Sequence, residues 1–218
     1  MITNIIFFIL LAASTLSGLV PLLFGAKRYK AFSIQLKALF IYLIGALFVE
    51  IVMSLLPLFE LTHLYIPVQL SFAIFEFLMI SYIFWLEFRK RSLKLTINGF
   101  VIAYLIGLII TFILTNSVGN VIDVADIMEA SFIIILSIVF FFKVFTDLEI
   151  PKLTNYPFFW LNSAFLVYFG VAFFLFLFNN AAKAFDEAIL YFLTAIHHIV
   201  NITYNILITI AICKVKKQ

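Results

Sequence analysis

Charged residues and cysteine are scarce in this chain of 218 residues. Charged side chains make up 11% of it and Cys213 is its single cysteine, whereas hydrophobic residues make up 66%. A soluble domain of this size cannot bury so much apolar surface, and so few charges cannot cover its exterior. One thiol also excludes an intramolecular disulfide and a cysteine-rich metal framework. The composition therefore excludes a soluble enzyme, a disordered chain and a nucleic-acid-binding domain, and it predicts an integral membrane protein.

Seven apolar stretches are long enough to cross a bilayer. A transmembrane helix needs about 20 apolar residues, because each adds about 1.5 Å across a hydrocarbon core about 30 Å thick. The stretches are continuous, unlike the alternating strands of a membrane β-barrel. We therefore predict an all-α protein, a single membrane domain of seven helices that covers residues 1–218. The predicted helices are Ile2–Phe24, Ala38–Leu58, Ile66–Leu86, Leu95–Thr115, Ile127–Phe145, Phe158–Phe178 and Ala188–Cys213.

The basic residues are distributed unevenly along the chain. With seven spans, alternate breaks between helices lie on the same side of the membrane, and 13 of the 14 Lys and Arg residues then fall on one side, with Lys183 the exception. Loops rich in Lys and Arg stay in the cytoplasm. We therefore predict that the N-terminus lies outside and the C-terminus lies in the cytoplasm.

Four ionisable groups are predicted to lie at one depth in the middle of the membrane. Counted from the predicted helix ends at about 1.5 Å per residue, Glu50 and Glu76 lie within a few Å of the midplane. Counting along the last helix places His197 and His198 at nearly the same level, and Tyr168 lies near it. Ionisable groups inside a membrane are costly and often mark functional sites.

The last predicted helix carries a broad polar face. His198, Asn201 and Asn205 recur at i, i+3 and i+7, which places them on one side of the helix. A face of this kind is expected to point toward other helices. We interpret these groups, together with polar residues of three other helices, as one cluster that responds to a ligand or a proton. Its members are Glu50, Glu76, His197, His198, Asn201, Tyr204, Asn205, Asn162 and Tyr168.

Each of these polar groups also has a structural interpretation. A buried glutamic acid can be neutral and hydrogen-bonded to a neighbouring helix, and Asn or Tyr side chains commonly bridge membrane helices. Glu50, Glu76 and one histidine could together ligate a metal. The sequence lacks the Glu-x-x-His and His-x-x-x-His spacings that would make such a site specific, so no metal ligands are predicted.

A short acidic segment with Asp123, Asp126 and Glu129 follows the fourth predicted helix. The predicted orientation places it outside the cell. It could meet a cation or a partner, but a solvated loop is the simpler interpretation. We therefore expect this segment to be an exposed loop.

The last predicted helix, Ala188–Cys213, contains no lysine. Microbial rhodopsins have seven helices, a similar length and this orientation, and they hold retinal on a lysine of their seventh helix. A covalently bound retinal is therefore excluded here, and no cofactor is predicted. The chain also lacks a Gly-rich phosphate loop, a Ser nucleophile elbow and a Cys–His pair, so the sequence does not indicate an enzyme.

Two short segments carry a resemblance to a known class of membrane protein. They are Phe75-Glu76-Phe77-Leu78 and the run from His197 to Asn205, His-His-Ile-Val-Asn-Ile-Thr-Tyr-Asn. With them, the whole chain resembles the seven-helix sensor regions that precede bacterial histidine kinases, and small stand-alone seven-helix proteins of bacteria. The resemblance implies a bacterial cytoplasmic membrane and, since no kinase domain is present, a signal that passes to a separate protein.

The sequence therefore suggests a receptor-like or sensory membrane protein with a small ligand or a proton as its input. Its expected partners are membrane lipids, the small ligand and a separate partner protein. Three alternatives remain open at this point: a non-catalytic subunit of a membrane complex, a proton-coupled transporter, and an intramembrane enzyme that acts on lipid. Carriers commonly show internal repeats or paired helices broken by Gly and Pro, and we see neither pattern here.

Overall fold

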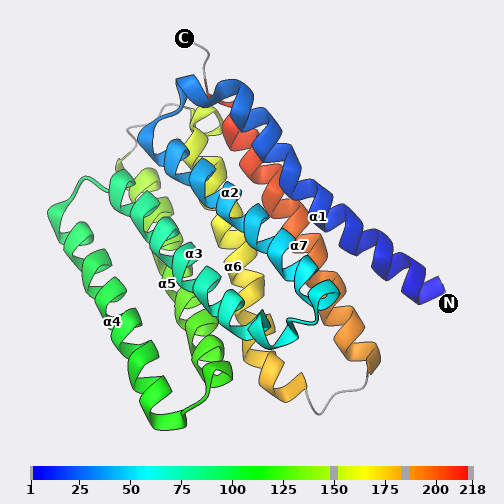
Figure 1. Cartoon of the computed structure of the whole chain (residues 1–218). Helices are drawn as coiled ribbons and strands as arrows, with labels where there is room; N and C mark the ends of the chain where they lie inside the picture. Colours follow the sequence, from blue (N-terminus) through cyan, green and yellow to red (C-terminus); the bar gives the residue numbers. More distant parts are fainter. Residues whose placement is uncertain (1, 148–151, 183–186, 216–218) are drawn as a thin grey trace. The chain divides into compact units, whose positions relative to one another are not determined.

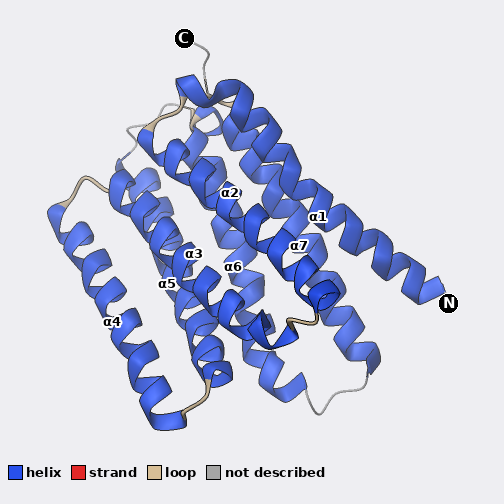
Figure 2. Ribbon diagram, viewed as in Figure 1, coloured by secondary structure: helices blue, strands red, loops and turns tan. Residues whose placement is uncertain are grey.

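The computed structural model describes residues 2–147, 152–182 and 187–215. These residues form seven long helices and no strand (Figure 2). The helices are α1 (Ile2–Arg28), α2 (Ile34–Leu55), α3 (Tyr65–Glu87), α4 (Arg91–Thr115), α5 (Val118–Asp147), α6 (Pro157–Ala182) and α7 (Glu187–Cys213). All seven are long and apolar enough to cross a membrane. The predicted all-α class is confirmed, and so are seven helices long and apolar enough to cross a membrane. Insertion in a membrane, the orientation and the single domain stay predictions.

The helices form two compact units. The central unit is Phe32–Phe132, and the terminal unit combines Met1–Ala31 with Ile133–Gln218. Helix α5 therefore contributes its first half to the central unit and its second half to the terminal unit.

In the central unit, α3 lies beside both α2 and α4 (Figure 1). Gly45 lets α2 approach α3, because a Cβ at this position would lie 2.5 Å from the ring of Phe75. Aromatic rings fill the interior: the Phe77 ring stacks on Tyr104 at 4.0 Å between centroids and lies 5.5 Å from that of Phe132. The core of this unit thus joins α3, α4 and the first half of α5.

Helix α5 begins nine residues earlier than predicted, at Val118 rather than Ile127. Asn116 ends α4 in the left-handed conformation, with φ 48°, which is a common way to stop a helix. The hydroxyl of Ser117 then accepts a hydrogen bond from the backbone N–H of Asn120, as an N-cap residue does. The break between these two helices is therefore much shorter than the predicted loop.

In the terminal unit, α7 lies beside both α1 and α6 (Figure 1). The guanidinium of Arg28, in the last turn of α1, donates hydrogen bonds to backbone carbonyls at the end of α7, the shortest being 2.6 Å to Cys213 O. The last carbonyls of a helix lack partners within the helix, and they carry partial negative charge. Arg28 therefore caps α7 and ties the ends of two helices together.

Replacing Arg28 with Gln should lower the free energy of unfolding in detergent by about 1–2 kcal/mol, because carbonyls of α7 lose a charged donor. This corresponds to a midpoint of thermal unfolding lower by roughly 2–8 °C. Lys27→Gln is the matched control, since it removes one positive charge from the exposed neighbouring position. Equal effects of the two substitutions would contradict the capping role.

Candidate functional site

Three carboxyl groups interact with one another inside the central unit. Glu76 of α3 is near enough to Asp126 and Glu129 of α5 for their charges to interact, and Asp126 and Glu129 also interact with each other. Two tyrosines, one each from α2 and α4, complete this group, so that every helix of the unit contributes to it. We call it the carboxyl cluster: Tyr42, Glu76, Tyr104, Asp126 and Glu129.

Tyr42 connects α2 to the cluster. Its hydroxyl donates a hydrogen bond of 2.5 Å to Oε1 of Glu76. The Tyr42 residue is buried, and Glu76 is half-buried. A short bond of this kind between helices fixes the orientation of the Glu76 carboxyl within the unit.

Glu129 and Tyr104 are the most deeply buried members of the cluster, at 3% and 1% exposure. Glu129 Oε1 and the Tyr104 hydroxyl have no hydrogen-bond partner among the described residues. The Tyr104 hydroxyl also lies near enough to all three carboxyls to interact with their charges. Buried polar atoms are rarely left unpaired. These two atoms could therefore each form a hydrogen bond with a further ligand.

The carboxyls of α5 correct a prediction. The segment with Asp123, Asp126 and Glu129 was expected to be a solvated outer loop, but it is helical, and Glu129 is buried. The reason is the apolar pattern around the acids: Val121, Ile122 and Ala125 are all buried. This pattern was visible in the sequence, and it could have identified Glu129 as an interior acid.

The cluster does not have the geometry of a metal centre. Among the residues described, no group of three or more His, Cys, Asp or Glu side chains is arranged to hold a metal ion.

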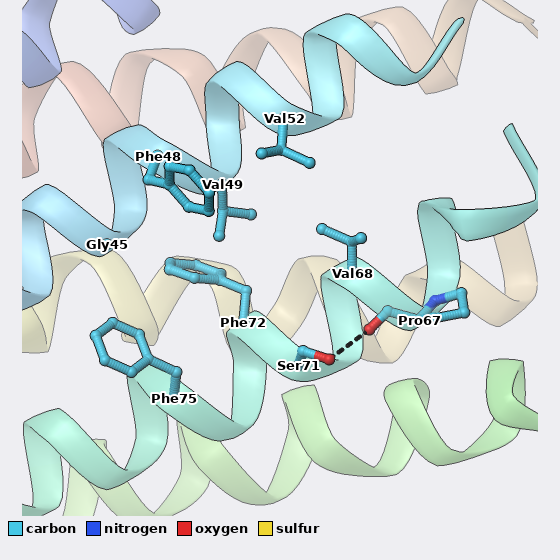
Figure 3. Close-up of a pocket in the computed structure, with 9 residues that line it drawn as sticks. All are labelled: Gly45, Phe48, Val49, Val52, Pro67, Val68, Ser71, Phe72 and Phe75. Atoms are coloured by element: carbon cyan, nitrogen blue, oxygen red, sulfur yellow. Dashed lines mark hydrogen bonds between the residues drawn. The ribbon is translucent and has the colours of Figure 1, made fainter. Parts of the chain in front are cut away.

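An apolar groove lies between α2 and α3 (Figure 3). Its volume is about 570 Å³. The hydroxyl of Ser71 lies in its wall and donates to the carbonyl of Pro67. The Phe72 ring, which also lines the groove, stacks on Tyr42 with 6.5 Å between centroids. One aromatic ring thus separates the groove from the tyrosine that binds Glu76.

In the terminal unit, the predicted asparagines bridge helices. Asn201 Nδ2 donates to the hydroxyl of Ser14 and Asn205 Nδ2 donates to that of Ser17, both at 2.9 Å, and these bonds join α7 to α1. Asn162 Nδ2 of α6 donates to the backbone carbonyl of Ser137 on α5. These contacts support the structural interpretation of the amides, since such bonds hold membrane helices together.

The predicted aromatic and imidazole groups of this unit lie along α6 and α7. The Tyr168 ring lies 6.0 Å from that of His197 and 4.9 Å from that of Tyr204, measured between centroids. His198 lies beside His197, with 6.0 Å between the rings, and both histidines are half-buried. The polar face of α7 thus divides between two neighbours, with amides toward α1 and rings toward α6.

The predicted site residues fall in both units. Glu50 and Glu76 belong to the central unit and the other seven to the terminal unit. Glu50 is half-buried, and it is not among the groups that interact with Glu76, Asp126 or Glu129 in the described chain. The convergence of acids and histidines at one level stays a prediction. Sequence reasoning missed four members of the carboxyl cluster: Tyr42, Tyr104, Asp126 and Glu129.

The chain was compared with family models, curated proteins and solved structures, and none of them matches it.

Replacing Tyr42 with Phe should shift the infrared carboxyl band of Glu76, because one of its oxygens loses a hydrogen-bond donor. The band is identified by its absence in Glu76→Gln. Unfolding free energy should also fall by about 1 kcal/mol. Tyr65→Phe is the control, since Tyr65 is exposed at the start of α3. A Glu76 band that is unchanged in Tyr42→Phe would disprove the proposed contact.

Proposed function

We propose that this chain is a receptor-like membrane protein whose input acts on the carboxyl cluster. In this proposal a proton or a small apolar or amphipathic ligand changes helix packing around Glu76, and a separate partner protein detects the change. The observation that carries the proposal is the unpaired, buried Oε1 of Glu129 beside two other carboxyls. A bacterial cytoplasmic membrane, implied by the resemblance to sensor regions, belongs to the same proposal.

The physical basis is electrostatic. Carboxylates that share an apolar environment repel one another, and burial of an uncompensated charge is costly. The net charge of such a buried cluster therefore changes when one of its carboxyls gains or loses a proton. Each change alters which hydrogen bonds the cluster forms, and thereby alters the relative stability of helix arrangements. The titratable groups of the cluster come from all four helices of the central unit, and the carboxyl of Asp123 interacts with that of Asp126 from the same helix.

The groove between α2 and α3 supports the second kind of input. Its lining is almost entirely apolar, and its volume of about 570 Å³ is within the usual range for small-molecule sites. A ligand in the groove would contact Phe72, which stacks on Tyr42. Displacement of these rings would weaken the hydrogen bond from Tyr42 to Glu76. The groove and the cluster are thus parts of one receptor mechanism.

A proton-coupled transporter is the second candidate, and the carboxyls themselves favour it. Acids inside membrane helices form the proton relays of many pumps and carriers, and Asp126 and Glu129 lie one turn apart on a membrane-spanning helix. A carrier would move protons or solute across a sealed vesicle, whereas a receptor would not. Flux through purified protein in liposomes therefore distinguishes the two functions.

Replacing Glu129 or Glu76 with Gln should abolish pH-dependent change in the central unit, because an amide cannot gain or lose the proton. The measurement is hydrogen exchange of α2 to α5 in the full chain, reconstituted in nanodiscs, between pH 5 and pH 8. After correction for the intrinsic pH dependence of amide exchange, we expect the protection of these helices to change with pH in wild type and to be constant in both variants.

Glu50→Gln is the matched control, since it removes a carboxyl of the same unit that lies outside the cluster. It should retain the wild-type response. A normal pH response in both Glu76→Gln and Glu129→Gln would disprove the proposed mechanism. Steady proton flux in liposomes would show that the protein is a transporter and contradict the receptor function.

A further inference from the structure

A second groove lies between α3 and α4, at the end where the two helices are joined. Its volume is about 300 Å³. The α3 wall presents residues at i, i+3, i+4 and i+7, and the α4 wall presents three residues of one helical face, so two helical stripes face each other. The lining residues are Leu78, Ser81, Tyr82 and Trp85 of α3 with Ile97, Asn98 and Val101 of α4.

The groove is graded in chemical character along its length. Nearest the α3–α4 turn, the ammonium of Lys94 lies 3.8 Å above the ring of Trp85. One turn deeper, Asn98 lines the groove from α4, and at the far end Leu78 and Val101 supply aliphatic walls. From Lys94 to Val101 the helix rises about 10 Å. A cationic end thus leads through a polar middle to an apolar end.

Ser81 supplies an unused polar group in the middle of the groove. The residue is 2% exposed, and its hydroxyl has no hydrogen-bond partner within the described parts of the chain. A serine in a membrane helix usually bonds to a backbone carbonyl of the preceding turn, as Ser71 does with Pro67. An unpaired hydroxyl in the wall of the groove is therefore available to a bound molecule.

Further positive charge surrounds the cationic end. Arg89 and Lys90 lie in the short turn between α3 and α4, and Arg91 is the first residue of α4; all three are exposed. Clusters of basic residues at the end of a membrane helix attract anionic lipid head groups. The positive charge of these residues would attract a negatively charged group of a ligand bound at the level of Lys94.

We propose that this groove binds one anionic phospholipid of the surrounding bilayer. The phosphate lies at Lys94 and the basic turn, the ester region meets Ser81 and Asn98, and the start of one acyl chain lies against Leu78 and Val101. A soluble anion fits less well, since most of the lining is apolar and both helices are membrane spans. This site is independent of the carboxyl cluster and of the receptor function proposed for it.

Trp85 provides a direct probe of the site. The chain contains two tryptophans, Trp85 and Trp160, so Trp160→Phe leaves one fluorophore beside the groove. The full chain is reconstituted in mixed phosphatidylcholine and phosphatidylglycerol vesicles in which one lipid at a time carries brominated acyl chains, which quench indole emission on contact. The fluorescence ratio of brominated to unbrominated vesicles gives the relative association of each lipid.

We expect phosphatidylglycerol to associate about fivefold more strongly than phosphatidylcholine, the factor expected for one basic residue near an anionic lipid. Lys94→Gln in the Trp160→Phe background should bring this ratio close to one, and Lys94→Arg should preserve it. Lys90→Gln, which removes an equal charge from the same turn outside the groove, is the matched control and should keep most of the preference. Val101→Phe should reduce quenching by both lipids, because it fills the apolar end.

Equal quenching by the two lipids in the Trp160→Phe protein would overturn the proposal. Loss of the preference in Lys90→Gln to the same extent as in Lys94→Gln would overturn it too, since it would mean attraction to a charged surface without a site. Inorganic phosphate added to the vesicles should leave the ratio unchanged at constant ionic strength. Competition by inorganic phosphate would assign the site to a free anion instead of a lipid.

Discussion

The cost of placing carboxyl groups away from water governs the central unit. Three acids interact there within helices that are otherwise almost continuously apolar. The tyrosines of α2 and α4 contact these acids in different ways. Tyr42 satisfies Glu76 directly, whereas Tyr104 stacks on the core ring of Phe77 and leaves its hydroxyl among the acids. The bond from Tyr42 fixes the carboxyl of Glu76, whereas the Tyr104 hydroxyl and Oε1 of Glu129 have no hydrogen-bond partner among the described residues.

The terminal unit uses its polar groups differently. Its asparagine amides donate to serine hydroxyls or to a backbone carbonyl, and each such contact joins two helices. Bonds of this kind between membrane helices contribute about 0.6 kcal/mol on average, so several are needed to hold α1 and α7 together. Polar residues inside a membrane protein are thus not equivalent. Asn201 and Asn205 each join α7 to α1 through a hydroxyl. The Oδ1 of Asn162, like the Oε1 of Glu129, is buried without a hydrogen-bond partner among the described residues.

Hydropathy alone was sufficient to predict the seven helices, because a continuous stretch of about 20 apolar residues is typical of a helix long enough to cross a membrane. It failed at the start of α5, where Asp123 and Asp126 lower the local hydropathy although the segment is a capped helix with a buried apolar face. The site was predicted only in part. Glu76 was identified by its depth, but depth does not reveal which neighbour it meets, and its contact with Tyr42 depends on the packing of α2 against α3. For the same reason, the partners of Asn201 and Asn205 could not be read from the periodicity of α7.

The order of the chain has a consequence for biosynthesis. The central unit is one uninterrupted segment, but the terminal unit needs residues from both ends, and Arg28 and Cys213 are 185 positions apart. A ribosome delivers helices to the membrane in order, so the central unit can complete its contacts while α7 is still being made. Until then the hydroxyls of Ser14 and Ser17 lack the amide donors of Asn201 and Asn205. A nascent chain that stalls before its last helix therefore presents an incomplete first helix, which cellular quality control can recognise and degrade.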